Sequence, residues 1–181
     1  MKKKIIIIVT IIVLLLFFLK NCSFQIGNIH IGKKNDMLTK QISNFERSDF
    51  SRNYYKNNNL VVLNLWATWC QPCVEEIPLL NRIKDKNKLS KVDFISLSID
   101  TDSTKLVKFN SSGKFKYKDI TFQNLEYRNV ILNTLDGKKG DDYIMTNSIP
   151  KTYLIKNNKV IKIINGMVNE AEIQNLIDKN K

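Results

Sequence analysis

Residues 60–73, LVVLNLWATWCQPC, are the stretch of sequence that decides the fold. Residues 60–66 form a short, nearly continuous apolar run rich in Val and Leu, and the asparagines before it mark a turn. This pattern is typical of a buried central strand. Cys70 and Cys73 follow, and an apolar pattern with helical spacing continues after Pro72. The sequence therefore predicts a strand that leads into a helix with a Cys-x-x-Cys pair at its beginning.

The position of these two cysteines predicts thiol chemistry. At a helix start, Cys70 meets backbone NH groups without partners and the positive end of the helix dipole, which favour the thiolate over the thiol. A thiolate is the form that attacks a disulfide. Cys73 lies one turn later on the same side of the helix, so it can resolve the mixed disulfide that Cys70 forms. We expect Cys70 to be at least partly exposed and Cys73 to be more buried.

Two other roles for the cysteine pair fit the sequence less well. A zinc site needs about two more nitrogen or sulfur ligands, and the only other Cys and the only His are Cys22 and His30, near the amino terminus. A structural disulfide that closes so small a loop stabilises a fold only weakly. We therefore expect no metal and interpret Cys70 and Cys73 as a redox-active disulfide.

The rest of the chain is predicted to alternate between strands and helices. The expected elements are helices at residues 36–45, at 103–110 with Asp102 or Ser103 as its cap, and at 127–135, a strand at 92–99, a hairpin of 151–155 with 160–164, and a helix after Asn169. Asn157 and Asn158 form the hairpin turn, and Asn169 with Glu172 resembles a capping box. This order predicts an α/β fold with a mixed central sheet flanked by helices, and an insertion at about residues 115–147.

Two segments resemble the TlpA/ResA-like branch of the thioredoxin superfamily. Residues 63–83, LNLWATWCQPCVEEIPLLNRI, are similar to its active-site segment, in which a Glu and a Pro follow Trp-Cys-x-x-Cys at these spacings. Residues 148–155, SIPKTYLI, are similar to its cis-proline loop, which enters a strand. The resemblance covers residues 49–181 and implies a thioredoxin-like fold with the insertion before the cis-proline loop. Members of this branch are extracytoplasmic, usually tethered, thiol-disulfide oxidoreductases.

The resemblance implies roles for the matching residues. Cys70 is the nucleophile and Cys73 is the resolving cysteine. Pro150 is the cis-proline, and Ile149 before it offers backbone groups to the substrate peptide.

The resemblance also implies that Glu76 tunes proton transfer. Six residues before the nucleophile, cytoplasmic thioredoxins carry a buried Asp, but this chain has Asn64, which cannot titrate. The alternative for Glu76, as for Glu75, is a solvated acid favoured by the helix dipole. We interpret Trp66 as a core residue, whereas Trp69 either packs or forms a substrate-facing platform.

The amino terminus carries an apolar targeting or anchoring segment. Residues 5–19 are apolar except for one Thr and follow three lysines, which places the start of the chain in the cytoplasm and the rest outside it. As a helix this run spans about 22 Å, short of the ~30 Å hydrocarbon core, but flanking lysines can snorkel. We favour an uncleaved anchor, while a lipid anchor on Cys22 and a cleaved signal peptide stay open. We assign residues 1–20 to this segment, 21–48 to a linker with a short helix, and 49–181 to the thioredoxin-like domain.

Composition limits the remaining function classes. The chain of 181 residues is 43% hydrophobic and 25% charged, as a single folded domain with a tether requires. Its net charge of +12 suits anionic lipid headgroups, nucleic acid or an acidic partner. No basic helix with interleaved aromatic residues appears in the sequence, so we expect no nucleic-acid binding.

The predicted activity is reduction of protein disulfides by Cys70 and Cys73 outside the cytoplasm, without a metal or organic cofactor. The expected partners are disulfide-containing protein substrates and a membrane-embedded thiol donor. The resemblance makes cytochrome c maturation and disulfide repair the candidate processes. The alternatives are an oxidant that donates its disulfide and a non-catalytic binding module. Two other classes do not fit. A copper-delivery protein on this fold needs Cys-x-x-x-Cys and a His after it, and no His follows Cys73. A thiol peroxidase needs its reactive Cys in a pocket lined by Pro and Thr, not in Trp-Cys-x-x-Cys.

Overall fold

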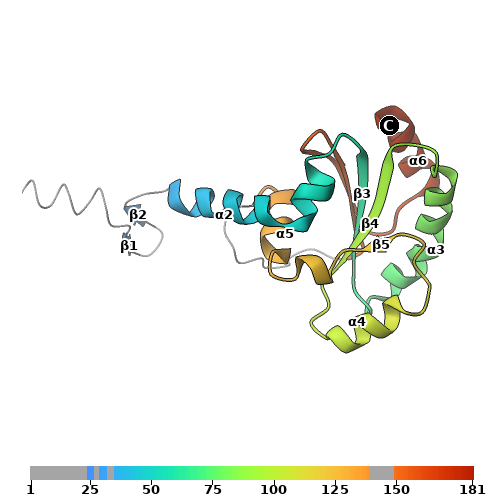
Figure 1. Ribbon diagram of the computed structural model, residues 1–181, viewed down its shortest axis with the longest axis horizontal. Helices are drawn as coiled ribbons and strands as arrows, with labels where there is room; N and C mark the ends of the chain where they lie inside the picture. Colours follow the sequence, from blue (N-terminus) through green and yellow to red (C-terminus); the bar gives the residue numbers. More distant parts are fainter. Residues whose placement is uncertain (1–23, 27–28, 32–34, 139–148) are drawn as a thin grey trace, which may run out of the picture. The chain divides into compact units, whose positions relative to one another are not determined.

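The structure is a computed structural model that describes residues 24–26, 29–31, 35–138 and 149–181 (Figure 1). The chain divides into two compact units, Met1–Ser43 and Asn44–Lys181.

In the first unit, β1 (Phe24–Ile26) and β2 (Ile29–Ile31) pair antiparallel within the residues that were predicted to form a linker. The predicted short helix is present as α2 (Asn35–Arg47), which crosses from the first unit into the second. The predicted anchor, residues 1–20, lies outside the described residues. Within the part of the chain that the structure describes, no helix has the length and apolar character needed to cross a membrane.

The second unit is built on a mixed sheet, as the sequence predicts, but the sheet has five strands where four were predicted. The strands are β3 (Leu60–Trp66), β4 (Val92–Ser98), β5 (Lys118–Asp119), β6 (Lys151–Lys156) and β7 (Lys159–Asn165), in the spatial order β5-β4-β3-β6-β7. β3 runs parallel to β4 and antiparallel to β6. The apolar stretch that begins the Cys-x-x-Cys motif is therefore the central strand, buried along its whole length.

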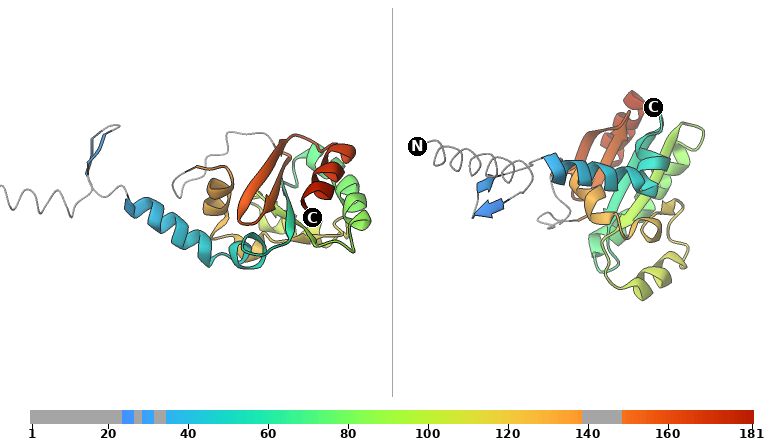
Figure 2. Two further views of the ribbon diagram at one scale, coloured as in Figure 1. Left: turned by 90° about the horizontal axis from the view of Figure 1, so that it is seen from above. Right: turned by 60° about the vertical axis from the view of Figure 1, so that its left-hand side comes forward.

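Helices cover both faces of this sheet (Figures 1 and 2). On one face lie α3 (Gln71–Lys86) and α6 (Glu170–Asn180), and on the other lies α5 (Arg128–Leu135). Successive side chains of a strand point to opposite faces. Accordingly, Leu60 and Val62 pack in the core with α3 and α6, whereas Val61 and Leu63 pack in the core with α5.

The described part of the insertion, residues 115–138, contributes three short elements. They are β5 at the edge of the sheet, a 3₁₀ turn at Phe122–Asn124, and α5, which matches the helix predicted at residues 127–135. Before the insertion, α4 (Ser103–Asn110) starts at the predicted cap, because the Asp102 side chain accepts hydrogen bonds from two backbone NH groups of its first turn. A π-helical turn, Ser51–Tyr55, leads into β3.

The turn between β6 and β7 and the start of α6 (Glu170–Asn180) are also as predicted from the sequence. Asn157 and Asn158 have φ values of 51° and 62° and connect β6 to β7 as the predicted hairpin turn. Asn residues tolerate this left-handed backbone better than most residues because their short polar side chain bonds locally. Asn169 caps α6, with its Oδ1 accepting from the NH groups of Ala171 and Glu172.

Candidate active site

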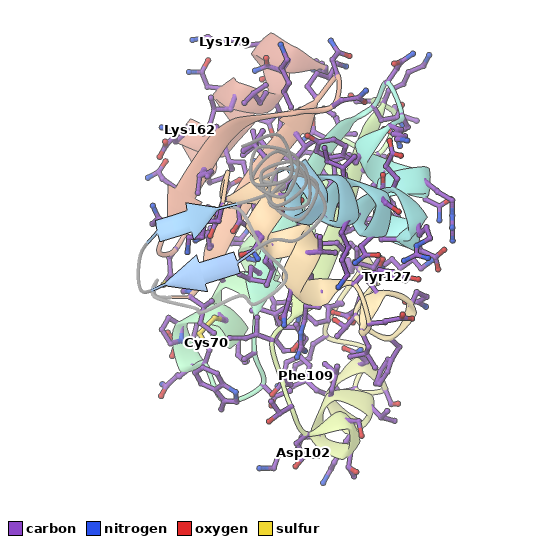
Figure 3. All side chains as sticks on the ribbon, turned by 90° about the vertical axis from the view of Figure 1, so that its left-hand side faces the viewer. Cys70, Asp102, Phe109, Tyr127, Lys162 and Lys179 are labelled. Atoms are coloured by element: carbon purple, nitrogen blue, oxygen red, sulfur yellow. A yellow bond between two sulfur atoms is a disulfide. The ribbon has the colours of Figure 1, made fainter. Side chains whose placement is uncertain are left out.

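The cysteine pair lies where the central strand ends and α3 begins. Cys70 is the N-cap of α3 and is joined to Cys73 by a disulfide with a Cα–Cα distance of 5.3 Å. Figure 3 shows this disulfide in yellow beside the Cys70 label. Cys70 Sγ accepts a hydrogen bond of 3.3 Å from the Cys73 backbone NH, one of the NH groups that a helix start leaves without an intrahelical partner. The helix start thus supplies the thiolate-stabilising contact that the sequence predicts.

The exposure of the two cysteines differs in part from the prediction. Cys73 is fully buried and is the less exposed of the two, as expected. Cys70 is only 6% exposed, however, so the expectation of a partly exposed nucleophile was wrong for the oxidised form. The reason is tertiary packing, because Trp66, Ala67 and Leu106 form a small apolar cluster around the disulfide and Ile149 packs against it.

The predicted cis-proline loop lies beside this cluster. The peptide bond between Ile149 and Pro150 is cis, which confirms the prediction. Pro150 leads directly into β6, which pairs with the central strand so that Lys151 lies opposite Leu65. This pairing fixes the loop next to the end of β3, from which the cysteine segment emerges.

Glu76 is fully buried, which excludes the alternative that it is a solvated acid. It lies on α3 three residues after Cys73 and therefore on the same face of the helix. Its carboxylate accepts hydrogen bonds from the Val168 backbone NH and from Asn64 Nδ2, the latter at 3.1 Å. Burial raises the pKa of Glu76 above its ordinary value, and the two hydrogen bonds oppose that rise. A buried carboxyl with a raised pKa keeps its proton to a higher pH than an exposed one, which suits it to act as an acid or base.

Asn64 is part of the same buried group. Besides its bond to Glu76, its Nδ2 lies 3.4 Å from Thr152 Oγ1 on β6. Tyr117 also lies close enough for the Glu76 charge to raise the pKa of its phenol, a smaller effect than that of burial itself. The neutral Asn64 amide holds Glu76 in place without adding a second buried charge.

The segment that follows β7 belongs to the site but was not predicted from the sequence. Gly166 NH donates to Pro150 O at 2.8 Å, and Val168 NH donates to Glu76. Met167, between them, is 51% exposed. This segment therefore touches both the cis-proline loop and the buried acid. Its only signal in the sequence is a glycine shortly before the Asn169 cap, and Gly166 does adopt a φ of +85°.

The remaining candidate residues separate clearly by exposure. Trp66 is fully buried, as predicted, and its Nε1 donates to Asp119 Oδ2 at 3.1 Å. Trp69 is 66% exposed, which excludes the packing role. Glu75 is exposed and accepts a hydrogen bond from Gln71, as its interpretation as a solvated acid requires.

No cluster of three or more His, Cys, Asp or Glu side chains suited to a metal ion occurs among the described residues.

The fold and the disulfide at the start of α3 define a thioredoxin-like protein with a Cys-x-x-Cys pair. The chain belongs to the AhpC/TSA family, whose model matches residues 33–164.

Among curated proteins, the chain is similar to the thiol-disulfide oxidoreductase ResA of several bacilli. It is 30% identical to ResA of Bacillus thuringiensis subsp. konkukian over 66% of this chain and 62% of that protein. It is 28% identical to ResA of a Bacillus cereus strain over 81% of this chain and 80% of that protein. The match thus spans less than two thirds of the length of the first of these relatives.

Solved structures show the same fold. StoA from Bacillus subtilis superposes with a TM-score of 0.52 at 15% identity, over 66% of this chain and 82% of StoA. A thiol:disulfide interchange protein of the thioredoxin family from Chlorobium tepidum gives a TM-score of 0.54 at 18% identity, over 70% of this chain and 81% of that one. These similarities agree with the resemblance to the TlpA/ResA-like branch.

Proposed function

We propose that this chain is a thiol-disulfide oxidoreductase that reduces protein disulfides with Cys70 and Cys73. The observation that carries the proposal is the disulfide at the start of α3, packed against Ile149 of the cis-proline loop, with the buried Glu76 one turn further on. Similarity to proteins named thiol-disulfide oxidoreductase supports the same activity.

The reaction is a two-electron exchange. In the reduced protein, the Cys70 thiolate attacks one sulfur of a substrate disulfide, so that a mixed disulfide forms and the first substrate thiolate leaves and takes up a proton. The Cys73 thiolate then attacks Cys70 Sγ, which releases the second substrate thiolate and forms the Cys70–Cys73 disulfide. Two electrons and two protons pass to the substrate, and a membrane-embedded dithiol donor returns them to the protein.

Glu76 is proposed as the acid or base of this exchange. Cys73 is fully buried in the disulfide form, so bulk solvent does not reach the sulfur that must lose a proton in the resolving step. Glu76 lies on the same helix face and, with its pKa raised by burial, can take the proton that Cys73 loses in the resolving step.

Trp69, Ile149 and Pro150 are proposed to bind the substrate. Ile149 packs against the disulfide cluster, where its backbone groups can pair with an extended substrate segment, and the cis bond to Pro150 sets their direction. The exposed Trp69 ring, next to the nucleophile, offers an apolar platform for the residues that flank the substrate cysteine.

The direction of the exchange follows from the charges around Cys70. Gln71 and Pro72 bring neither a His nor a cation to stabilise the thiolate, and Glu75 adds negative charge nearby. A less stabilised thiolate makes a weaker oxidant, so we expect a potential nearer to the roughly −270 mV of thioredoxin than to the roughly −120 mV of DsbA. Equilibration with glutathione and dithiothreitol buffers measures it. A value more positive than about −180 mV would favour the alternative, a disulfide donor.

The place of action is proposed from the amino terminus. The lysines and the apolar run at residues 2–19 support attachment to the membrane with the domain outside the cytoplasm. Cytochrome c maturation and repair of misoxidised proteins are the candidate processes, because the chain is similar to ResA.

The activity is tested by reduction of insulin with dithiothreitol as the donor. We expect the unmodified chain to accelerate precipitation of the insulin B chain and Cys70→Ser to be inactive. An unmodified chain no faster than Cys70→Ser would identify a non-catalytic binding module instead. Substrates are then identified with Cys73→Ser, which is expected to retain them in cells as mixed disulfides on Cys70.

A further inference from the structure

One end of α5 is hydrogen-bonded to the end of β4 and the residues after it. Arg128, the first residue of α5, donates from Nη1 to the carbonyl oxygens of Ser98, the last residue of β4, at 3.3 Å and of Asp100 at 2.9 Å. The buried Asp100 carboxylate in turn accepts from Thr68 NH at 2.8 Å and from Thr68 Oγ1 at 2.7 Å. Thr68 precedes Cys70 by two residues. The start of α5 is therefore linked through Asp100 to the cysteine segment.

The other end of α5 is linked to the cis-proline loop. Asp136, the C-cap of α5, accepts from Lys151 Nζ at 3.2 and 3.3 Å and from Tyr153 OH at 2.7 Å. Lys151 directly follows Pro150. The ion pair is buried, with side-chain exposures of 2% for Lys151 and 5% for Asp136.

The middle of α5 is held rigidly between these two links. Val130, Ile131 and Leu135 are buried in the core that also contains Leu63 of β3 and Tyr153 of β6. Figures 1 and 2 show α5 on the face of the sheet opposite α3 and α6, a face where Phe45 and Phe50 pack in the same core. A helix packed in this way can transmit a fixed separation from one end to the other.

A buried ion pair is a poor means of stabilising a fold, because desolvation of the two charges offsets most of their attraction. What such a pair adds over an apolar contact is directional geometry, since both oxygens of Asp136 are within hydrogen-bond distance of one ammonium group. Because Lys151 directly follows Pro150, we infer that the ion pair fixes the geometry of the cis-proline loop.

We propose that α5 links the cysteine segment to the cis-proline loop and sets their separation, with Arg128, Asp100, Asp136 and Lys151 as positioning residues. The inference rests on the proposed function, in which the substrate peptide binds between these two segments. The link through Asp136 and Lys151 acts on peptide binding. The link through Arg128 and Asp100 acts on the orientation of Cys70.

The test measures how fast the full chain, in its reduced form, reduces each of two disulfide substrates. Dithiobis(nitrobenzoate) is a small disulfide that needs only a reactive Cys70, whereas insulin also needs the cis-proline loop. The double variant Asp136→Asn/Lys151→Met removes both charges but keeps the side-chain shapes and an oxygen that accepts from Tyr153. We expect it to lower kcat/KM for insulin about tenfold, through KM, while the rate with dithiobis(nitrobenzoate) stays within about twofold.

The matched control is Asp85→Asn/Lys116→Met, which makes the same substitutions in an exposed ion pair. It is expected to leave both rates unchanged. At the other end of α5, Thr68→Val removes the hydroxyl bond to Asp100 and should change the rates with both substrates together. A double variant that loses both rates equally, or neither, would overturn the proposal.

Two further measurements keep the result decisive. If Asp136→Asn/Lys151→Met does not fold, Tyr153→Phe removes one bond to Asp136 without leaving a charge unpaired, and it should show the same insulin-selective loss to a smaller extent. Equal rates for Tyr153→Phe and the unmodified chain with insulin would then refute the link. An unmodified chain that reduces neither substrate would instead refute the proposed function itself.

Discussion

At the scale of single residues, the site combines a buried cysteine, Cys73, with a buried carboxyl, Glu76, one turn further along α3. Glu76 has no contact with solvent in this structure and depends on Val168 NH and Asn64 Nδ2 for its hydrogen bonds. Unpaired buried charges are very costly, so these two donors are what allow the ionised form at all. Burial nevertheless dominates and keeps the pKa of Glu76 above its ordinary value.

The first prediction concerns the reactivity of Cys70. Glu76→Gln removes a titrating group close to the cysteines and keeps its shape, so the pH dependence of Cys70 alkylation should lose a component. The measurement is the rate of iodoacetamide reaction with the reduced protein from acid to alkaline pH. Glu75→Gln is the matched control because Glu75 is exposed, and its profile should follow that of the unmodified chain. Superimposable profiles for Glu76→Gln and the unmodified chain would return Glu76 to a structural role.

The second prediction concerns stability. Because the pKa of Glu76 is higher in the folded than in the unfolded chain, the folded state holds a proton that the unfolded state has already lost. The contribution of Glu76 to the free energy of unfolding is therefore fully present below its ordinary pKa of about 4.5 and declines as pH rises through the raised pKa. Glu76→Gln should remove this decline, so the variant gains stability relative to the unmodified chain as pH rises. Urea unfolding at a series of pH values measures the difference. A variant whose stability relative to the unmodified chain stays constant or falls as pH rises would contradict the prediction.

At the scale of elements, α6 connects its own cap to the site. Asn169 accepts from the NH groups of Ala171 and Glu172, at 3.0 and 3.1 Å, directly after the Val168 NH that donates to Glu76. The start of the helix and the position of Val168 are thus fixed by neighbouring residues.

The third prediction follows from this cap. Asn169→Ala leaves NH groups of the first turn without their side-chain acceptor, so it should lower the free energy of unfolding by about 1 kcal/mol. Asn169→Asp keeps the acceptor and should cost almost nothing. Urea unfolding of the two variants measures the difference. An Asn169→Ala variant as stable as the unmodified chain would show that the start of α6 does not depend on this side chain.

At the scale of the whole molecule, the disulfide lies at the end of the central strand, where both cores of the domain meet. Cys70 and Cys73 share their apolar cluster with Trp66 at the end of β3 and with Leu106 of α4. The redox state of the pair is therefore coupled to the stability of the entire fold.

The fourth prediction concerns this coupling. A reducing potential means that folding favours the disulfide form, so the oxidised chain should be more stable than the reduced chain. The difference is about 1.4 kcal/mol for each 30 mV by which the potential of the folded pair lies below that of the same pair in the unfolded chain. Guanidinium unfolding with and without dithiothreitol measures this. Cys70→Ser/Cys73→Ser is the control and should not respond to the reductant. A reduced form with a larger free energy of unfolding than the oxidised form would support the oxidant alternative.

The sequence by itself determined the central strand, the cysteine helix, the caps at Asp102 and Asn169, and the turn at Asn157, because each depends on residues a few positions apart. The family resemblance of two segments also singled out Glu76, in residues 63–83, and Pro150, in residues 148–155. Burial was decided only by the tertiary structure. Val168, which donates to Glu76, lies 92 residues away from it, and no local pattern shows that the two will meet. The same holds for the low exposure of Cys70 and for the pairing of Asp136 with Lys151, since both arise where distant segments pack together and exclude water.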